Sequence, residues 1–197
     1  VITAFERWLH QTQGLRFAGY ESLWQWSVDD PEAFWRSIVQ FFQVPLNTPP
    51  ERMRSDDAMP ATHWLPGARL NIVDQVLRHR ALGTPAIIYD SEAAGQGSVS
   101  WAELAHRVGA VAQSLRALGV QAGDRVAAYL PNIPATVVTF LAAASLGAVW
   151  TLCAPDRGAL SVVDRLQQVA PKVLIAVDGY RFAGKAFDRR SALQEIL

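Results

Sequence analysis

The sequence predicts an α/β fold with an N-terminal helical arm, then a β-hairpin and a mostly parallel sheet of β-α-β units flanked by helices. Residues 125–177 alternate short β-prone runs with longer runs of helical periodicity, and residues 85–100 hold two β-prone runs around a polar loop. Five of the seven tryptophans lie before residue 67. Because β-α-β crossovers return the chain in the same direction, the alternation favours parallel strands with helices on both faces of the sheet.

Residues 1–66 form the predicted helical arm. Its clearest helix begins at Asp30, whose carboxylate can cap free amides, with Pro31 at the first helical position. Apolar residues then recur at helical spacing and predict one broad buried face: Phe34, Trp35, Ile38, Val39, Phe41 and Phe42. The stretch 47–60 is rich in proline and charge and has little to bury, so we expect a surface connection there.

Capping residues mark the first helices after the arm. Asn71 is expected to cap one helix, and Ser100 with Glu103 matches a capping-box pair that opens another. The β-prone runs 85–89 and 97–100 lie between these helices, and we expect them to pair as a hairpin.

The alternating part follows. The alternation in residues 125–177 predicts strands at 125–130, 148–152 and 172–177, with helices at 133–146 and 160–169. In parallel sheets, ligands bind beyond the carboxyl ends of the strands. The segments that follow these three strands are therefore the candidate sites.

Composition excludes several classes of protein. Half of the residues are hydrophobic, and the 18 Lys and Arg balance the 18 Asp and Glu, without the basic excess typical of nucleic-acid binding. The single cysteine, Cys153, cannot form an internal disulfide, and no set of Cys and His has zinc-ligand spacing, so neither a metal site nor an oxidised scaffold is expected. No apolar run reaches the roughly twenty residues of a membrane-spanning helix, and we expect a cytoplasmic protein with no membrane partner.

Catalytic motifs are missing from the sequence. No glycine-rich loop ends in Lys-Ser or Lys-Thr, and no G-x-G-x-x-G follows a predicted strand. The four histidines lie on or beside predicted helices, away from the strand ends, so no Ser-His-Asp triad can be placed. Cys153 follows a strand, but a lone thiol beside an apolar strand is more often packed than nucleophilic, and we expect it to be buried. No catalytic residue is expected in this chain.

One basic segment is the strongest candidate for a binding site in the sequence. Residues 177–190 carry four cations, Arg181, Lys185, Arg189 and Arg190, against two aspartates, and they include two glycines. A basic, glycine-containing loop at a strand end can hold a phosphate through guanidinium forks and close backbone approach. The alternative is a solvated surface loop, which composition alone favours.

Short motifs in a fixed order resemble the N-terminal part of the adenylate-forming acyl-CoA synthetases. The motifs are Leu70-Asn71, Ser100-Trp101-Ala102-Glu103-Leu104, Gly123-Asp124-Arg125-Val126-Ala127-Ala128-Tyr129-Leu130-Pro131-Asn132, Ser145-Leu146-Gly147-Ala148-Val149-Trp150 and Ala154-Pro155-Asp156. Residues 171–181 are most similar to the acetoacetyl-CoA synthetase (acetoacetate–CoA ligase) branch. The resemblance implies that 1–66 is the helical extension of the acetyl- and acetoacetyl-CoA synthetases. It also implies that 67–197 is the first α/β sub-domain of a truncated AMP-binding (adenylation) domain.

The resemblance implies a two-step reaction in the complete protein. ATP and a carboxylate give an acyl-adenylate and pyrophosphate, and the thiol of coenzyme A then displaces AMP, with Mg²⁺ as the metal. The residues that hold ATP follow this chain in the family, so the chain alone is expected to be inactive and to bind no cofactor tightly. The implied partners are the remainder of the adenylation domain and the C-terminal domain, with coenzyme A and a short carboxylic acid as substrates.

The resemblance also implies binding residues. Arg181 and Lys185 match basic residues that reach the 3′-phosphate of coenzyme A, which makes the phosphate clamp the preferred interpretation of the basic segment. Cys153, Ala154 and Pro155 match the wall of the pantetheine tunnel, although relatives have glycines where this chain has Ala154 and Pro155.

Two alternatives stay open. The chain could be a short, non-catalytic binding or scaffold protein with the same sheet, or part of a ligase for another short carboxylic acid. In isolation, the uncovered edges of a parallel sheet would favour self-association.

Overall fold

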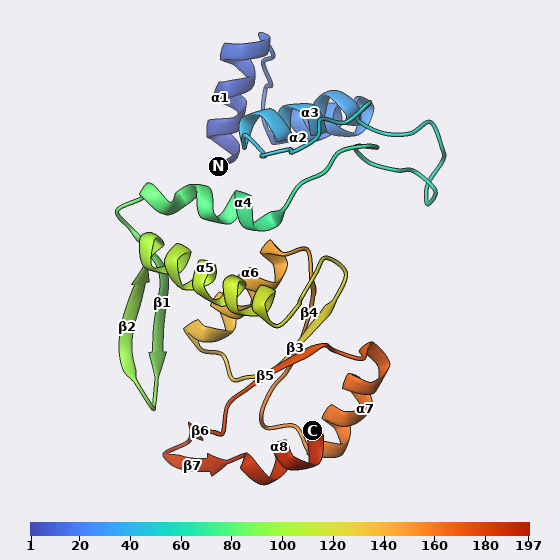
Figure 1. Ribbon diagram of the computed structural model, residues 1–197. Coiled ribbons are helices and arrows are strands. Elements are labelled where there is room, and N and C mark those ends of the chain that lie inside the picture. The colour runs from blue at the N-terminus through green and yellow to red at the C-terminus, as the bar shows by residue number, and fades with distance from the viewer. The chain divides into compact units, whose positions relative to one another are not determined.

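The structure is a computed structural model that describes residues 1–197, except for the side chain of Arg80. The chain divides into two compact units, Val1–Leu70 and Asn71–Leu197 (Figure 1). Among the described residues, no helix is both long and apolar enough to span a membrane.

The first unit is helical. It contains α1 (Ile2–Gln13), α2 (Tyr20–Asp29) and α3 (Pro31–Phe41). Phe5, Leu9 and Leu23 form its buried centre, and aromatic side chains from α1 and α3 pack around them. The predicted cap is confirmed, because the Asp30 carboxylate accepts a hydrogen bond of 3.0 Å from the Ala33 amide.

The connection from Phe42 to Leu70 contains buried side chains, although its sequence predicted a surface segment with little to bury. Isolated β-bridges join Thr48 to Arg69 and Arg54 to Trp64. Met53 and Ser55 are each only 5% exposed. Burial of Ser55 is permitted because its hydroxyl accepts a hydrogen bond of 2.9 Å from the His63 amide.

The second unit contains three small sheets. An antiparallel hairpin pairs β1 (Pro85–Ser91) with β2 (Gly95–Ser100), and a parallel sheet has the order β4 (Val149–Cys153), β3 (Arg125–Tyr129), β5 (Val173–Ala176). A second antiparallel hairpin pairs β6 (Gly179–Phe182) with β7 (Lys185–Asp188). The helices are α4 (Ile72–Leu77), the 3-10 turn η1 (Arg78–Ala81), α5 (Trp101–Ala117), α6 (Pro134–Ser145), α7 (Ala159–Val169) and α8 (Arg190–Ile196). The predicted α/β class with parallel strands is confirmed.

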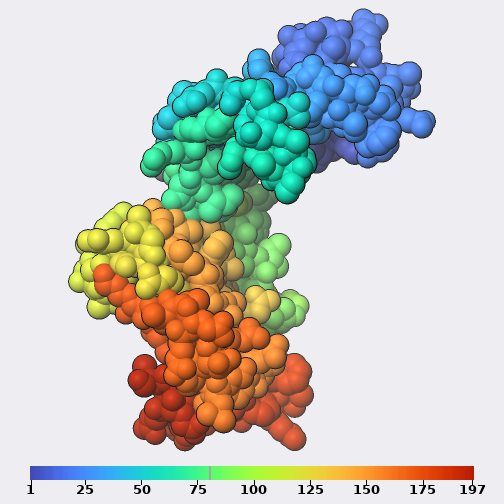
Figure 2. Space-filling view, turned by 90° about the vertical axis from the view of Figure 1, so that its right-hand side faces the viewer, coloured from blue at the N-terminus to red at the C-terminus, as the bar shows by residue number. Residues whose placement is uncertain are grey.

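Two apolar cores cover the faces of the parallel sheet. On one face, Val126 of β3 packs with buried side chains of α5 and α6. On the other face, Ala127 and Tyr129 pack with α7 and with partly buried leucine and isoleucine side chains of α8. Figure 2 shows the orange and red surfaces of α7 and α8 next to each other, as their contacts require. Alternation of side chains along β3 therefore separates the two cores.

The capping predictions hold in most of their detail. Asn71 Oδ1 accepts from the Val73 amide at 2.9 Å, and its side-chain amide donates to the Ala144 carbonyl at 2.9 Å. The Ser100 hydroxyl accepts from the Glu103 amide at 3.2 Å, whereas the Glu103 carboxylate pairs with Arg107 one turn further along α5. The reciprocal half of the capping box is therefore replaced by an ion pair on the helix surface.

Candidate functional site

The carboxyl ends of the three parallel strands meet at one edge of the sheet. Tyr129, the last residue of β3, lies opposite Cys153 of β4 and Ala176 of β5. The segments after β4 and β5 therefore leave the same edge of the sheet, one on each side of β3. This is the edge at which open α/β sheets bind ligands.

Tyr129 fixes the segment that follows β4. Its ring is fully buried, and its hydroxyl lies 2.8 Å from the Pro155 carbonyl oxygen and 3.1 Å from that of Arg157, to which it donates. Burial raises the pKa of the Tyr129 hydroxyl, so the group stays protonated and keeps its donor. The turn after β4 is therefore held by a neutral hydrogen bond inside the core.

The residues expected along a pantetheine wall differ in their exposure. Cys153 is buried, as expected, in the core that also holds Ala127 and Tyr129. Pro155 is buried as well, whereas Ala154 is exposed. Of these three residues, Ala154 offers its side chain to solvent.

The basic segment after β5 is a hairpin and not the loop that its composition predicted. β6 and β7 pair antiparallel around a two-residue turn, in which Ala183 has φ 52° and Gly184 has φ 74°. Positive φ at both central positions is the type I′ geometry, whose twist matches paired strands. Asparagine-glycine is the usual signal for this turn, and alanine at the first position concealed it.

The hairpin places its four cations in different surroundings. Register pairs Arg181 with Ala186 and Lys185 with Phe182, so the pleat directs Arg181 and Lys185 to opposite faces. Both are exposed, and neither forms a salt bridge with any described residue. Arg190 instead pairs with the Asp188 carboxylate. Arg181 and Lys185 are therefore free to meet an anion from solvent.

Arg189 is held at the base of the same hairpin. Its guanidinium lies 5.3 Å from the ring centre of Tyr180 and 5.8 Å from that of Phe187, and these two rings stack 5.0 Å apart. Arg189 also donates to the Tyr180 hydroxyl at 3.0 Å, and this hydrogen bond raises the pKa of the guanidinium. Its backbone amide donates to the Asp178 carbonyl at 2.7 Å. From its charge alone, Arg189 was grouped with the other cations of the segment. The pairing of Tyr180 with Phe187 shows instead that Arg189 packs on both rings and secures the hairpin.

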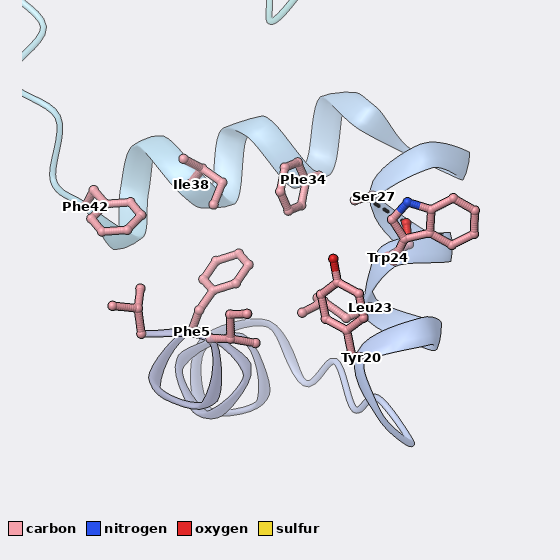
Figure 3. Close-up of a pocket in the computed structure, with 10 residues that line it drawn as sticks. Phe5, Tyr20, Leu23, Trp24, Ser27, Phe34, Ile38 and Phe42 are labelled. Carbon is pink, nitrogen blue, oxygen red and sulfur yellow. Dashed lines mark hydrogen bonds between the residues drawn. The ribbon is translucent and has the colours of Figure 1, made fainter.

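A separate apolar pocket lies in the helical unit. It has a volume of about 210 Å³ and is open to solvent between α1, α2 and α3 (Figure 3). Ring and aliphatic side chains line it, among them Phe5, Tyr20, Trp24 and Phe42. The hydroxyls of Tyr20 and Ser27 belong to this lining, and that of Ser27 donates to the Trp24 carbonyl at 2.6 Å. The Ser27 hydroxyl is therefore already bonded within α2, and most of the pocket offers apolar packing surface.

Histidines and acidic residues of the described chain form no group of three that could hold a metal ion. His10 accepts from the Arg16 side chain at 2.8 Å, and the His79 ring packs 5.6 Å from Trp101. Both contacts are structural.

Comparisons with known proteins agree along the whole chain. The model of the AMP-binding enzyme family matches residues 73–196, and that of the acetyl-coenzyme A synthetase N-terminus matches residues 20–76. Acetoacetyl-coenzyme A synthetase from Rhizobium meliloti is 38% identical over 99% of this chain and 30% of its own length, and acetoacetyl-CoA synthetase from Xenopus tropicalis is 34% identical over 98% and 29%. A malonamoyl-CoA synthetase from Penicillium aethiopicum is 30% identical over 98% of this chain and 28% of its own.

A solved structure gives the same result. Acetoacetyl-CoA synthetase from Streptomyces lividans matches with a TM-score of 0.92 and 47% identity, over 99% of this chain and 31% of that one. The chain thus spans about 30% of the length of the relatives that it matches. With the family model covering most of the chain and the relatives agreeing on both units, the chain belongs to the AMP-binding enzyme family.

Proposed function

We propose that this chain is the N-terminal part of an ATP-dependent acid–thiol ligase that converts acetoacetate to acetoacetyl-CoA through an acyl-adenylate. The observation that carries the proposal is similarity to acetoacetyl-CoA synthetases over 99% of the chain, in sequence and in structure. In the first step, the carboxylate attacks the α-phosphorus of ATP and releases pyrophosphate. In the second step, the thiolate of coenzyme A attacks the acyl carbon and releases AMP.

The chain's own share of this reaction is coenzyme A binding. Arg181 and Lys185 are exposed and without a salt bridge to any described residue, and they flank a tight turn beyond the carboxyl edge of the sheet. Their side chains leave opposite faces of the hairpin, so the two cations would approach the dianionic 3′-phosphate of coenzyme A from either side of the turn, each with a charge-assisted contact. Ala154, with Cys153 and Pro155 behind it, would border the pantetheine chain at the end of β4, on the other side of β3.

Adenylation itself belongs to the rest of the protein. The relatives are about three times longer than this chain, and no motif for the ATP phosphates occurs in it. Residues 1–66 would serve as the helical extension and residues 67–197 as the first sub-domain of the adenylation domain. The remainder of that domain and the C-terminal domain would supply the groups for ATP and Mg²⁺. The 197-residue chain alone is then inactive, and a cytoplasmic location stays a prediction.

The acid is proposed by chemical class. Acetoacetate and malonamate, the acids named by the relatives, are both short and both carry a carbonyl carbon at C3. A ligase for a short acid with a C3 carbonyl is therefore the wider proposal, and acetoacetate its preferred member.

The test is thioester formation by the complete protein with competing acids. Butyrate is the matched control, since it has the chain length of acetoacetate and lacks the C3 carbonyl. We expect kcat/KM for acetoacetate to exceed that for butyrate by at least about tenfold, as one directed hydrogen bond would provide. Equal values would contradict the C3-carbonyl class, and no thioester from any short acid would favour a non-catalytic protein.

Self-association is expected of the isolated chain. β4 lies at one edge of the parallel sheet, and its Val149 and Leu152 are half-exposed. Unpaired strand edges with apolar side chains template pairing with another copy. Light scattering of the isolated chain should show a species larger than 21.6 kDa, and Leu152→Lys should reduce it; a monomer at high concentration would contradict this expectation.

A further inference from the structure

Glu92 joins two hairpins that lie far apart in the sequence. It stands at the turn between β1 and β2, and its carboxylate accepts hydrogen bonds from the Ala183 amide at 2.8 Å and the Gly184 amide at 2.7 Å. Each carboxylate oxygen receives one amide. These bonds connect positions 91 and 92 residues apart.

The turn of the β6–β7 hairpin is shaped to receive an anion. Ala183 and Gly184 both have positive φ, and successive amides in such a turn point into one concave face. A carboxylate with two oxygens matches two amides, and hydrogen bonds to a charged acceptor are roughly twice as strong as those between neutral groups. Glu92 therefore fixes both the conformation and the position of the turn.

This contact matters because the hairpin is short. Its strands have four residues each and form a sheet of their own, and an isolated two-stranded hairpin is marginally stable in water. Arg189 secures its base through Asp178 and Tyr180. Glu92 secures the opposite end, where Lys185 follows the turn directly.

The Glu92 side of the contact is itself ordered. The Ser91 hydroxyl accepts from the Ala94 amide at 3.0 Å, which closes the turn that carries Glu92. Further along the same hairpin, the side chain of Gln96 donates to the Asp90 carboxylate at 3.0 Å. The β1–β2 hairpin thus offers a preorganised anchor.

We propose that Glu92 is a positioning residue for coenzyme A, which holds the β6–β7 turn so that Arg181 and Lys185 stand where they meet the 3′-phosphate. The proposal rests on the coenzyme A role of this hairpin. It has a clear rival, because a carboxylate near a phosphate site can also act by repulsion. The two actions predict opposite changes in affinity: loss of positioning weakens coenzyme A binding, and loss of repulsion strengthens it.

The test uses Glu92→Gln in the complete protein. Glutamine keeps the shape and one acceptor oxygen, but its amide nitrogen cannot accept from the second turn amide. We expect the KM for coenzyme A to rise by about tenfold, while kcat and the KM values for ATP and the acid stay unchanged. With dephospho-coenzyme A, which lacks the 3′-phosphate, variant and wild type should have the same KM.

Asp90→Asn is the matched control. Asp90 is an exposed carboxylate on the same hairpin, and its partner is Gln96, so this change removes one negative charge without touching the β6–β7 turn. It should leave the KM for coenzyme A unchanged. Hydrogen exchange provides a readout besides activity: the Ala183 and Gly184 amides should exchange faster in Glu92→Gln than in either the wild type or Asp90→Asn.

The outcomes separate this inference from the function on which it rests. If Arg181→Ala with Lys185→Ala raises the KM for coenzyme A but Glu92→Gln leaves it unchanged or lowers it, the positioning role is overturned and the phosphate site stands. If coenzyme A and dephospho-coenzyme A have equal KM values in the wild type, the phosphate site fails and the positioning role is overturned with it. Unchanged exchange at Ala183 and Gly184 would also overturn the inference.

Discussion

Tyr129 is the side chain on which the turn after β4 depends. It is fully buried, and its hydroxyl is the donor for the carbonyl oxygens of Pro155 and Arg157. A phenylalanine would fill the same space and leave these carbonyls without that donor. The cost of an unsatisfied buried acceptor, about 1–3 kcal/mol, is larger than the net value of an average hydrogen bond.

Tyr129→Phe should therefore lower the free energy of unfolding by about 1–3 kcal/mol and speed amide exchange in residues 154–158. Urea unfolding and hydrogen exchange measure the two effects. Tyr20→Phe is the matched control, because Tyr20 is 67% exposed and the same loss of a hydroxyl should leave stability unchanged. Equal effects of the two substitutions would show that the hydrogen bond to Pro155 contributes nothing.

The contact of Asp188 with Arg190 at the end of β7 should depend on pH. Hydrogen bonds from the Arg190 side chain, and then from its backbone amide, lower the pKa of the Asp188 carboxyl from 3.8 to about 2. Because this pKa is lowered, the contact between Asp188 and Arg190 stabilises the folded state fully above pH 3.8, and this stabilisation is lost as the pH falls towards 2. An NMR titration of the Asp188 carboxyl should have its midpoint near 2, and Arg190→Gln should return it towards 3.8; a midpoint near 3.8 in the wild type would refute the pairing.

Single residues were predictable where their partners are close in the sequence. Asp30, Asn71 and Ser100 cap the helices expected of them, because a cap and its amide lie two or three positions apart. Arg181 and Lys185 stood out by charge. Glu92 did not, because its partners lie 91 and 92 positions further on and no local pattern indicates a contact over that distance.

At the scale of elements, the β6–β7 hairpin is the feature that the sequence concealed. Its four-residue strands are too short for a clear alternation, and its turn uses alanine where asparagine is usual. The α/β alternation from β3 to β5 was predictable because α6 is a long apolar run between short β-prone segments and α7 is strongly amphipathic. The helix α8 was missed because seven residues give hardly two turns of pattern.

Glycine at position 179 is required by the hairpin. A Cβ on Gly179 would lie 2.6 Å from the carbonyl oxygen of Phe187, so Gly179→Ala must move the backbone of β7. We expect a loss of about 1–3 kcal/mol in the free energy of unfolding, with faster amide exchange throughout β6 and β7.

The matched control for Gly179 is the same substitution in a helix. Gly109 lies exposed inside α5, and no atom outside the helix backbone lies within 4 Å of the place that a Cβ would take. Gly109→Ala should therefore stabilise by about 0.5–1 kcal/mol through helix propensity alone. We expect the two substitutions to change the free energy of unfolding in opposite directions. A stabilising Gly179→Ala would contradict the paired arrangement of β6 and β7.

At the scale of the molecule, the sheet edge and the two hairpins form one connected arrangement that carries the exposed Arg181 and Lys185. The carboxyl ends of β3, β4 and β5 lie together, Tyr129 fixes the segment after β4, and β6–β7 follows β5 directly. Arg189 and Glu92 then secure the two ends of that hairpin. The sheet itself was predictable from hydrophobic periodicity, whereas this arrangement was not, because it depends on contacts between segments distant in the sequence.

The proposed reaction would divide between this chain and the rest of the complete protein. Adenylation would take place outside this chain, and thioester formation would need the coenzyme A that we propose Arg181 and Lys185 bind. Removing both cations should therefore affect the second half-reaction alone. Arg190→Ala is the control, because Arg190 lies on the same segment but is already paired with Asp188.

The most direct test compares the two half-reactions in the complete protein carrying Arg181→Ala and Lys185→Ala. We predict that acetoacetate-dependent ATP–pyrophosphate exchange keeps the wild-type rate, while the KM for coenzyme A rises at least about tenfold and the KM for dephospho-coenzyme A does not change. An unchanged KM for coenzyme A, or an equal loss in both half-reactions, would contradict the account.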